Sequence, residues 1–233
     1  METLIINTGS SSIKYQLLDM PSGKLLCSGL VERIGEKNGK ILHKKFTEEK
    51  EVDVEIEEPV PNHDVGMQQV ATLLTDSKYG VISNTDKVKL VGHRVVLGGE
   101  KFSNTTRVTD EVKKAIDELS IIAPLHNPPN LTGINVAERI FKYAVQVAVF
   151  DTSFHQTIPE YAFRYAIPNK LYYENGIRVY GYHGTSHRYV MERAAKMLNK
   201  PVDKVNLITI HLGNGASMTA IKNGKSIDTS LGM

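Results

Sequence analysis

The chain has 233 residues, of which 41% are hydrophobic and 23% charged, a composition typical of a globular protein with one large or two modest domains. The formal net charge of +2 excludes a strong field for collecting nucleic acid or an anionic membrane, and we find no run of about 18 apolar residues that would span a bilayer. The single cysteine, Cys27, excludes an internal disulfide framework and, without a signal-peptide pattern, favours the reducing cytoplasm.

Strands are predicted for most of the first 35 residues. Leu4–Asn7 is a short apolar run, apolar and polar residues alternate from Ile13 to Leu17, and a third strand is expected at 25–34. Residues 36–62 are polar and acidic, and we expect a surface hairpin or loop there.

Helices and strands then alternate along the chain. Val112, Ala115, Ile116 and Leu119 have helical spacing, with Thr109 as the expected cap. The other predicted elements are helices at 65–74, 131–141 and 187–198 and strands at 88–96, 145–150, 205–210 and 217–221. Strands mixed with amphipathic helices predict an α/β fold.

One internal similarity suggests a duplicated domain. Residues 6–10 and 210–214 each follow an apolar strand, and each leads through small residues into a second strand that runs to a Gly-Lys pair. Two unrelated hairpin turns are the equally weighted alternative, because such turns are common.

The segment Asn7–Lys14 combines small residues, hydroxyl groups and a lysine. Such residues let backbone amides approach an anion and add donors and charge, which suits phosphate. A serine-rich turn with an exposed lysine is the alternative. The sequence matches neither the standard phosphate-binding loop nor the dinucleotide-binding pattern. Thr219 occupies a position where the first requires glycine, and Met218 occupies one where the second does.

Arg94 follows an apolar strand and precedes a glycine turn. Its guanidinium could hold the head of a short carboxylate while Val96 contacts the tail; a structural pair with Glu100 is the alternative. His126, in a proline-rich segment, could donate to phosphate or be structural. Asp151 ends a buried strand, where it could orient a reacting group, act as a base, or cap a helix.

His183 and His187 lie four residues apart. Zinc is disfavoured, because the metalloprotease glutamate is missing and Gly184 is expected to interrupt a helix. Thr185 or Ser186 is expected to cap the next helix, leaving His183 in the preceding turn. A histidine there could meet charge on a transferring phosphoryl group.

The order of these motifs resembles the acetate kinase family, in the sugar kinase/Hsp70/actin superfamily. The matching strings are INTGSSSIK at 6–14, GHRVV at 92–96, APLHNPPN at 123–130, VFDTSFHQTIP at 149–159, GYHGTSHRYV at 181–190 and HLGNGAS at 211–217. The resemblance covers the whole chain. It implies duplicated actin-like (ribonuclease H-like) domains: 1–151 on the carboxylate and phosphate side, and 152–233 as the first, incomplete part of a nucleotide-binding domain.

The resemblance also implies an activity: reversible transfer of the γ-phosphoryl group of ATP to acetate, giving acetyl phosphate and ADP, with Mg²⁺ or Mn²⁺. The implied catalytic residues are Asp151, His183, His126 and Arg94. Arg94 also binds substrate, with Val96, Leu125 and Tyr182 around the methyl group. Asn7 lies on the metal side, and the implied phosphate contacts are Ser10, Ser12, Lys14, His211, Leu212, Gly213, Asn214 and Gly215.

Three residues depart from the family pattern. Leu97 replaces a histidine, Tyr182 a phenylalanine and Val179 an arginine, which bears on acyl preference. Family members continue past the motif at 228–233 with a second arginine, the adenosine pocket and a metal-binding glutamate. We therefore expect little activity from these residues alone, and a cytoplasmic homodimer for the complete enzyme. The alternatives are a propionate or butyrate kinase and a non-catalytic binding fragment.

Overall fold

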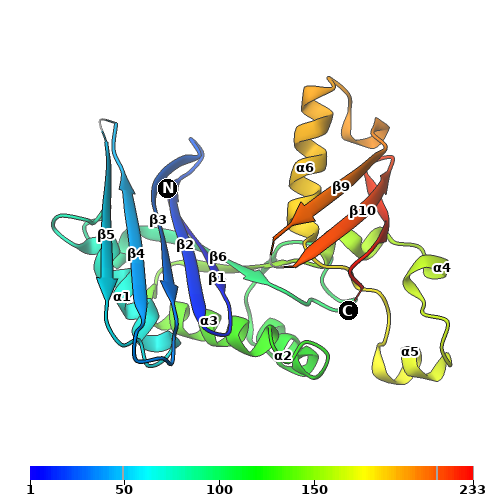
Figure 1. Ribbon diagram of the computed structural model, residues 1–233, viewed down its shortest axis with the longest axis horizontal. Coiled ribbons are helices and arrows are strands. Elements are labelled where there is room, and N and C mark those ends of the chain that lie inside the picture. Colours follow the sequence, from blue (N-terminus) through cyan, green and yellow to red (C-terminus); the bar gives the residue numbers. More distant parts are fainter. Residues whose placement is uncertain (49, 214, 233) are drawn as a thin grey trace. The chain divides into compact units, whose positions relative to one another are not determined.

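The computed structural model describes residues 1–48, 50–213 and 215–232, which form two compact units (Figure 1). Unit 1 comprises Met1–Val95 and Thr105–Val149. Unit 2 comprises Val96–Asn104 and the described residues of Phe150–Met233. Within the described part of the chain, no helix has both the length and the apolar character needed to cross a membrane.

Unit 1 is built on a mixed sheet. Its strands lie in the order β5-β4-β3-β2-β1-β6-β8-β7. Strands β1 to β5 pair consecutively as antiparallel neighbours, while β1 pairs with β6 in parallel. The strands are β1 (Glu2–Thr8), β2 (Ser12–Asp19), β3 (Lys24–Glu32), β4 (Lys40–Phe46), β5 (Glu51–Glu57), β6 (Val88–Val95), β7 (Thr106–Arg107) and β8 (Val145–Phe150). The helices are α1 (His63–Thr75), α2 (Asp110–Glu118) and α3 (Asn127–Ile140).

The core of unit 1 lies between this sheet and two helices. Alternation along β1 and β2 directs Leu4, Ile13 and Leu17 to the same side, where they join Met67 of α1 and Phe141 after α3 in one buried cluster. The strands predicted at 4–7, 13–17, 25–34, 88–96 and 145–150 are confirmed. The polar segment 36–62 forms the β4–β5 hairpin, the first of the two expected alternatives.

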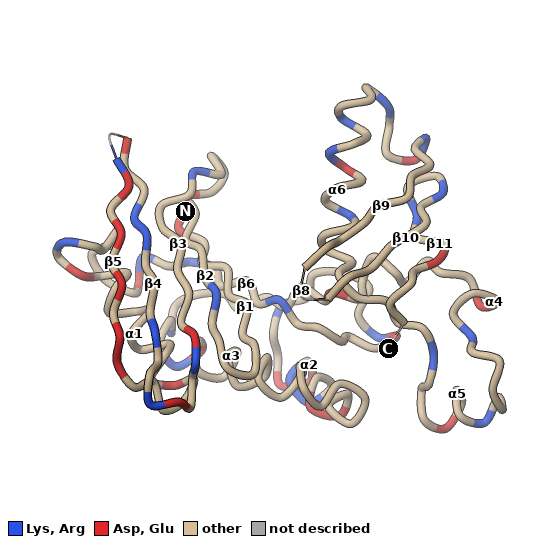
Figure 2. The backbone as a smooth tube through the Cα atoms, in the orientation of Figure 1, with Lys and Arg blue, Asp and Glu red and all other residues tan. Residues whose placement is uncertain are grey.

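The β5 strand lies at an edge of the sheet and carries a row of carboxylates. Figure 2 shows acidic residues along β5 beside basic residues on β4. Lys44 pairs with Glu51 and Asp53, and Lys40 pairs with Glu55. Charges on an edge strand disfavour pairing with a further chain, which explains why this strand is so polar.

Helix α3 begins four residues before its predicted start. Pro128 and Pro129 lie in its first turn, where a missing backbone amide removes no bond within the helix. Asn130 then donates to the backbone oxygen of Thr8 over 2.7 Å, tying the helix to the end of β1. The proline-rich segment is therefore a helix start.

Unit 2 contains a smaller antiparallel sheet in the order β11-β10-β9. Its elements are α4 (Glu160–Phe163), α5 (Lys170–Asn175), α6 (Gly184–Met197), β9 (Leu207–Leu212), β10 (Ala216–Lys222) and β11 (Lys225–Thr229). Met191 and Ala195 of α6 pack with Ile221 of β10. The other face of β9 is apolar and exposed, with Ile208, Ile210 and Leu212 on it.

The internal similarity in the sequence corresponds to similar local structure. β1-β2-β3 and β9-β10-β11 are both antiparallel meanders, each with its first strand followed by a glycine-containing turn. Both second turns contain a left-handed glycine, Gly23 with φ 71° and Gly224 with φ 72°. The similarity therefore extends from the sequence to the backbone.

Close packing of α3 on β1 leads to a first prediction. A Cβ at Gly133 would lie 2.2 Å from Thr8 Oγ1 and 2.9 Å from Thr8 Cβ. We expect Gly133→Ala to lower the free energy of unfolding by about 1–3 kcal/mol, because the clash outweighs the better helix propensity of alanine. Urea denaturation measures the change. Gly66→Ala in α1 is the matched control, because its Cβ would meet only side chains at 3.2 Å or more; an equal loss in both variants would contradict the prediction.

Buried His93 leads to a second prediction. Its Nε2 donates a 2.8 Å hydrogen bond to the Gln146 side-chain oxygen, and burial lowers the pKa of His93 to about 4. The unfolded chain, with a histidine pKa near 6.5, therefore binds more protons between about pH 6.5 and 4, and stability falls as the pH falls through that window. We expect His93 to account for a loss on the order of 3 kcal/mol. Urea midpoints measured across this range should vary less with pH in His93→Asn; an unchanged slope would contradict the assignment.

Candidate functional site

In unit 1 the structure brings Asn7 and Arg94 together. They lie near the ends of the parallel strands β1 and β6, where Ile6 is in register with His93. Asn7 Oδ1 accepts a hydrogen bond from the Arg94 guanidinium over 3.4 Å, and both residues are half-buried. The predicted metal-side residue and the predicted carboxylate binder are therefore neighbours at an edge typical of ligand sites.

The turn between β1 and β2 is held by hydrogen bonds to its backbone. The Gly9 amide donates to the Ser12 backbone oxygen over 2.8 Å. His63 Nε2 donates to the Gly9 backbone oxygen, also over 2.8 Å. The Gly9 amide is thus used inside the turn. Ser10 and Lys14 are exposed and Ser12 is half-buried, so their polar side chains supply the donors on this turn.

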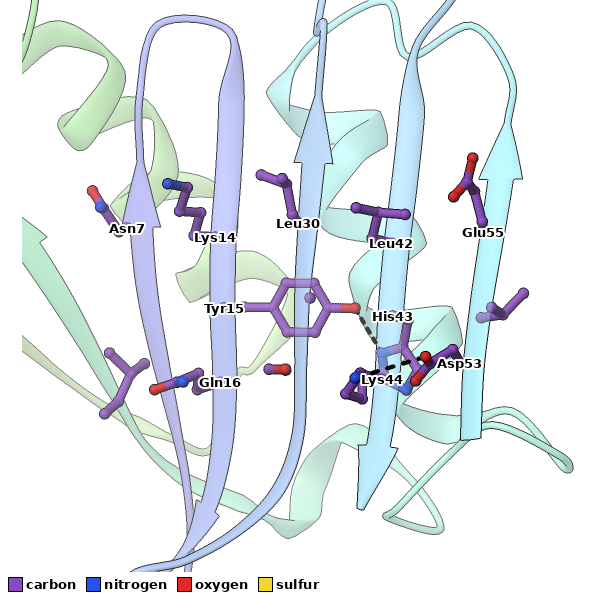
Figure 3. Close-up of a pocket in the computed structure, with 14 residues that line it drawn as sticks. Asn7, Lys14, Tyr15, Gln16, Leu30, Leu42, His43, Lys44, Asp53 and Glu55 are labelled. Carbon is purple, nitrogen blue, oxygen red and sulfur yellow. Dashed lines mark hydrogen bonds and ion pairs between the residues drawn. The ribbon is translucent and has the colours of Figure 1, made fainter. Parts of the chain in front are cut away.

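A hollow of about 790 Å³ lies over one face of the unit 1 sheet. Figure 3 shows Asn7 and Lys14 on neighbouring strands beside it, in register with each other. Of the predicted site residues, these two line the hollow. The Tyr15 hydroxyl on β2 forms a 2.7 Å hydrogen bond with His43 Nδ1 on β4. The tyrosine ring passes over Gly29 on β3, where any side chain would collide with it.

The predicted acyl-pocket residues are divided between the units. Leu125 belongs to unit 1 and is 73% exposed, next to exposed His126, which is the N-cap residue of α3. Val96 is buried in unit 2, and Tyr182 is half-buried there. Burial raises the pKa of the Tyr182 hydroxyl, so this group stays protonated at neutral pH.

In unit 2, Asp151 holds the start of α6 through two of its oxygens. Its carboxylate Oδ2 accepts from the His183 amide over 2.7 Å, and its backbone oxygen accepts from the Gly184 amide over 2.9 Å. Asp151 is 1% exposed. The carboxylate therefore binds a terminal amide of the helix, as in the helix-cap alternative, next to the predicted catalytic histidine.

The predicted cap of α6 was wrong. The helix begins at Gly184, and the N-cap residue is His183, with a left-handed φ of 59°. Gly184 starts the helix because a Cβ there would lie 2.2 Å from the Asp151 oxygen. Thr185 and Ser186 lie inside the first turn. Tertiary contact with Asp151 replaces the side-chain cap that the local sequence suggested.

Histidines from three elements meet around α6. The His183 and His211 rings stack with centroids 4.1 Å apart, and His187 lies edge-on to His211 at 6.4 Å and to His155 at 5.8 Å. Burial is the main cause that lowers the pKa of His187, to about 4, and also that of His155; neighbouring histidines lower both further. The cluster around His183 therefore contains two buried rings with lowered pKa values, those of His155 and His187.

The predicted phosphate loop follows β9 beside this cluster. His211 Nδ1 bonds Ser186 Oγ over 2.9 Å, and the Gly213 amide donates to the Gly215 oxygen over 3.0 Å. A Cβ at Gly215 would lie 3.3 Å from His183 Nε2. Leu212 is 81% exposed, and Asn214 lies outside the described residues. The structure thus places Gly215 and His211 against His183.

The described residues contain no group of three histidine, cysteine, aspartate or glutamate side chains arranged to hold a metal ion. The ring nitrogens of His187 are hydrogen-bonded to Thr209 Oγ1 and Ser217 Oγ, both over 2.8 Å. Both ring nitrogens of His187, the second histidine of the possible zinc pattern, therefore have hydroxyl partners.

Two polar residues of unit 2 were missed from the sequence. Buried Arg178 pairs with Glu100 and lies over the Phe163 ring at 3.6 Å, so Glu100 has an arginine partner within its own unit. Ser217, 2% exposed, bonds both His183 and His187. The sequence pointed to Ser217 only through its place in the string HLGNGAS, because a local sequence pattern does not reveal which distant residues a side chain contacts.

Comparison with known proteins decides the family. A family model described as the Acetokinase family matches residues 2–233. The chain belongs to the acetokinase family. It is 57% identical to the acetate kinase of Flavobacterium johnsoniae and 52% identical to that of Halothermothrix orenii, and all of the chain is covered in both.

Solved structures of the acetokinase family agree with this assignment. The Porphyromonas gingivalis acetate kinase superposes with a TM-score of 0.91 at 45% identity, over 99% of this chain and 57% of that one. A Francisella tularensis propionate kinase gives 0.88 at 42% identity, over 99% and 57%. The chain spans 57% and 58% of the two curated relatives. The mixed α/β class is confirmed.

The contact between Gly184 and Asp151 leads to a third prediction. We expect Gly184→Ala to destabilise the protein by about 1–3 kcal/mol, because its Cβ would press on a backbone oxygen that has little freedom to move. Thermal unfolding measures the effect. Gly213→Ala is the matched control, since its nearest neighbour would be the His211 ring at 3.4 Å. Equal unfolding temperatures for Gly184→Ala and the unsubstituted protein would contradict the prediction.

Proposed function

We propose that the complete protein containing these residues is an acetate kinase. It would transfer the γ-phosphoryl group of ATP to acetate, reversibly, giving acetyl phosphate and ADP. The observation that carries the proposal is the match to acetate kinases along the whole chain, at 57% and 52% identity in the two curated relatives. A carboxylate oxygen attacks the γ-phosphorus while the bond to the leaving ADP oxygen breaks, so no proton transfer is required.

Unit 1 would bind the acceptor and part of the phosphate chain. Arg94 presents a planar guanidinium, whose paired donors match a carboxylate. The 3.4 Å contact with Asn7 supports this role, because it orients the arginine beside the end of β1. Ser10, Ser12 and Lys14 would contact phosphate oxygens, and His126 would donate to the phosphoryl group.

Unit 2 would stabilise the charge of the transferring phosphoryl group. His183 is held at the start of α6 and lies against Gly215, in the loop proposed to bind ATP phosphates with His211, Leu212, Gly213 and Asn214. Asp151 supports this position through the His183 amide. A donor fixed before the reaction lowers the barrier without reorganisation, which is the main form of catalysis open to a phosphotransferase.

Mg²⁺ or Mn²⁺ would accompany ATP and neutralise phosphate charge. Asn7 fits as one ligand, because an amide oxygen suits a hard cation. The described residues hold no dedicated cluster of acidic or histidine ligands. The other ligands would be mostly phosphate oxygens and water, the usual arrangement for Mg²⁺ at nucleotides.

A longer acyl chain is the second candidate. The Francisella tularensis structure, 42% identical, is a propionate kinase, and Tyr182 adds a hydroxyl to the proposed acyl pocket. We favour acetate because the two curated relatives, at 57% and 52% identity, are acetate kinases. Relative rates on acetate, propionate and butyrate separate these substrates.

We also propose that the fold is a pair of duplicated actin-like domains, divided near residue 151, with the second incomplete here. The paired meanders β1-β2-β3 and β9-β10-β11 support this. The exposed Ile208, Ile210 and Leu212 agree with further structure covering β9 in the complete protein. The nucleotide pocket would be completed there, and the complete enzyme would be a homodimer.

Hydroxylamine trapping of acetyl phosphate tests the activity of the complete protein. We expect product from ATP, Mg²⁺ and acetate, and a loss of about 10- to 100-fold in kcat/KM for Arg94→Gln, because a charged hydrogen bond to the acceptor is removed. Arg107→Gln, on an exposed position of β7, is the matched control and should stay within about twofold.

Failure of the complete protein to form any acyl phosphate from acetate, propionate or butyrate would contradict the proposal and favour a non-catalytic binding protein. We expect the 233 residues by themselves to turn over little, because the relatives extend well beyond the matched part. Turnover equal to that of the complete protein would contradict that expectation.

A further inference from the structure

We propose that Thr209, His187 and Ser217 form a directional hydrogen-bond chain that holds His183 as a neutral ring with its proton on Nε2. Ser217 is then a positioning residue for the donor that faces the phosphate loop. This inference deepens the proposed function and rests on it for the role of His183. The chain lies wholly within unit 2 and joins β9, α6 and β10 to the N-cap of α6 (Figure 1).

The chain is continuous and buried. Thr209 Oγ1 lies 2.8 Å from His187 Nδ1, His187 Nε2 lies 2.8 Å from Ser217 Oγ, and Ser217 Oγ lies 2.9 Å from His183 Nδ1. Thr209, His187 and Ser217 are 5%, 1% and 2% exposed. Water therefore has little access to these links, and each proton must find its acceptor within the chain.

Counting protons fixes the direction. Among the described residues, His187 Nδ1 is the hydrogen-bond partner of the Thr209 hydroxyl, so this hydroxyl donates to Nδ1. A neutral His187 then carries its proton on Nε2 and donates to Ser217. The Ser217 proton is left to be donated to His183 Nδ1.

The opposite direction fails at its last link. If both His183 Nδ1 and His187 Nε2 donated to Ser217, the buried Ser217 hydroxyl would lack an acceptor among the described residues. If the Ser217 proton were donated to His187 Nε2 instead, His187 Nδ1 would donate to Thr209. The buried Thr209 hydroxyl would then lack an acceptor among the described residues. A protonated His183 would meet the same obstacle, because it too donates from Nδ1. An unmet buried hydroxyl costs about 1–3 kcal/mol, which disfavours both alternatives.

The charged and titratable groups around the chain agree with neutral rings. His155 and His211 face His187 from the neighbouring elements, and burial together with these rings lowers the pKa of His187 to about 4. The Asp151 carboxylate acts in the opposite direction and raises the pKa of His187, but by less than burial and the neighbouring rings lower it; its Oδ2 accepts from the His183 amide. The stacked His211 ring fixes the plane of His183.

The direction of the chain determines what the other ring nitrogen of His183, Nε2, can bind. His183 Nε2 would lie 3.3 Å from a Cβ built at Gly215, so this nitrogen borders the loop proposed for ATP phosphates. With Nδ1 receiving the Ser217 proton, Nε2 of the neutral ring carries hydrogen and is a donor. An anionic phosphoryl oxygen is the chemistry that this donor would recognise.

Nitrogen NMR of ¹⁵N-histidine-labelled complete protein tests the chain directly. At about pH 8, where a free histidine is neutral, we expect His183 to show a protonated Nε2 and a bare Nδ1. Its signals are assigned by their loss in His183→Gln. A protonated Nδ1 on His183 would overturn the proposal, whatever the enzyme's activity.

Kinetics of matched variants test the positioning role. We expect Ser217→Ala to let His183 exchange between tautomers and to lower kcat about tenfold, with KM for acetate changed less than about threefold. Thr209→Val should act in the same direction by about threefold, and Thr209→Ser should restore the rate, because it returns the donor.

Ser226→Ala is the control, since it also removes a buried hydroxyl bonded to a buried histidine, His155, over 2.8 Å. We expect its kcat to stay within about twofold of the unsubstituted protein. A loss equal to that of Ser217→Ala would overturn a specific role for Ser217, as would an unchanged tautomer in Ser217→Ala. Absence of turnover in the unsubstituted protein would overturn the proposed function instead, and the NMR result would still decide the chain.

Discussion

The Asp151 contacts at the start of α6 are the constraint on which the rest of unit 2 depends. One residue at the end of β8 binds two consecutive amides, those of His183 and Gly184. This arrangement holds His183 in a left-handed conformation that costs a non-glycine residue free energy, and it requires glycine at the next position. The strand end thereby determines where the helix begins and which way the catalytic candidate faces.

The histidines around α6 are better explained by hydroxyl partners than by a metal. Four rings lie close together, yet their nitrogens reach Ser186, Thr209, Ser217 and Ser226. Burial disfavours the imidazolium form of His155 and His187, so these two rings act as neutral, oriented donors and acceptors. Such a set is suited to receiving negative charge next to a loop with little side-chain bulk.

The two meanders show how one supersecondary unit serves different tasks. In unit 1, Asn7 lies near the end of the first strand beside Arg94, while in unit 2, His211 lies near the end of the corresponding strand beside His183. In both, small residues follow the first strand in the sequence, and a left-handed glycine lies in the second turn. Under the proposed function, Arg94 would bind the carboxylate and His183 would contact the phosphoryl group, so different side chains near the equivalent strand ends would serve different ligands.

The sequence alone determined the α/β class, most element positions, the family and a set of site candidates, because hydrophobic periodicity and short motifs are local properties. It misplaced the starts of α3 and α6, where prolines in a first turn and the Asp151 contacts override local capping signals. Only the tertiary structure showed that Glu100 pairs with Arg178, and that Ser217 joins His183 to His187. These pairings join residues far apart in the chain, and no local pattern encodes which buried hydroxyl meets which ring.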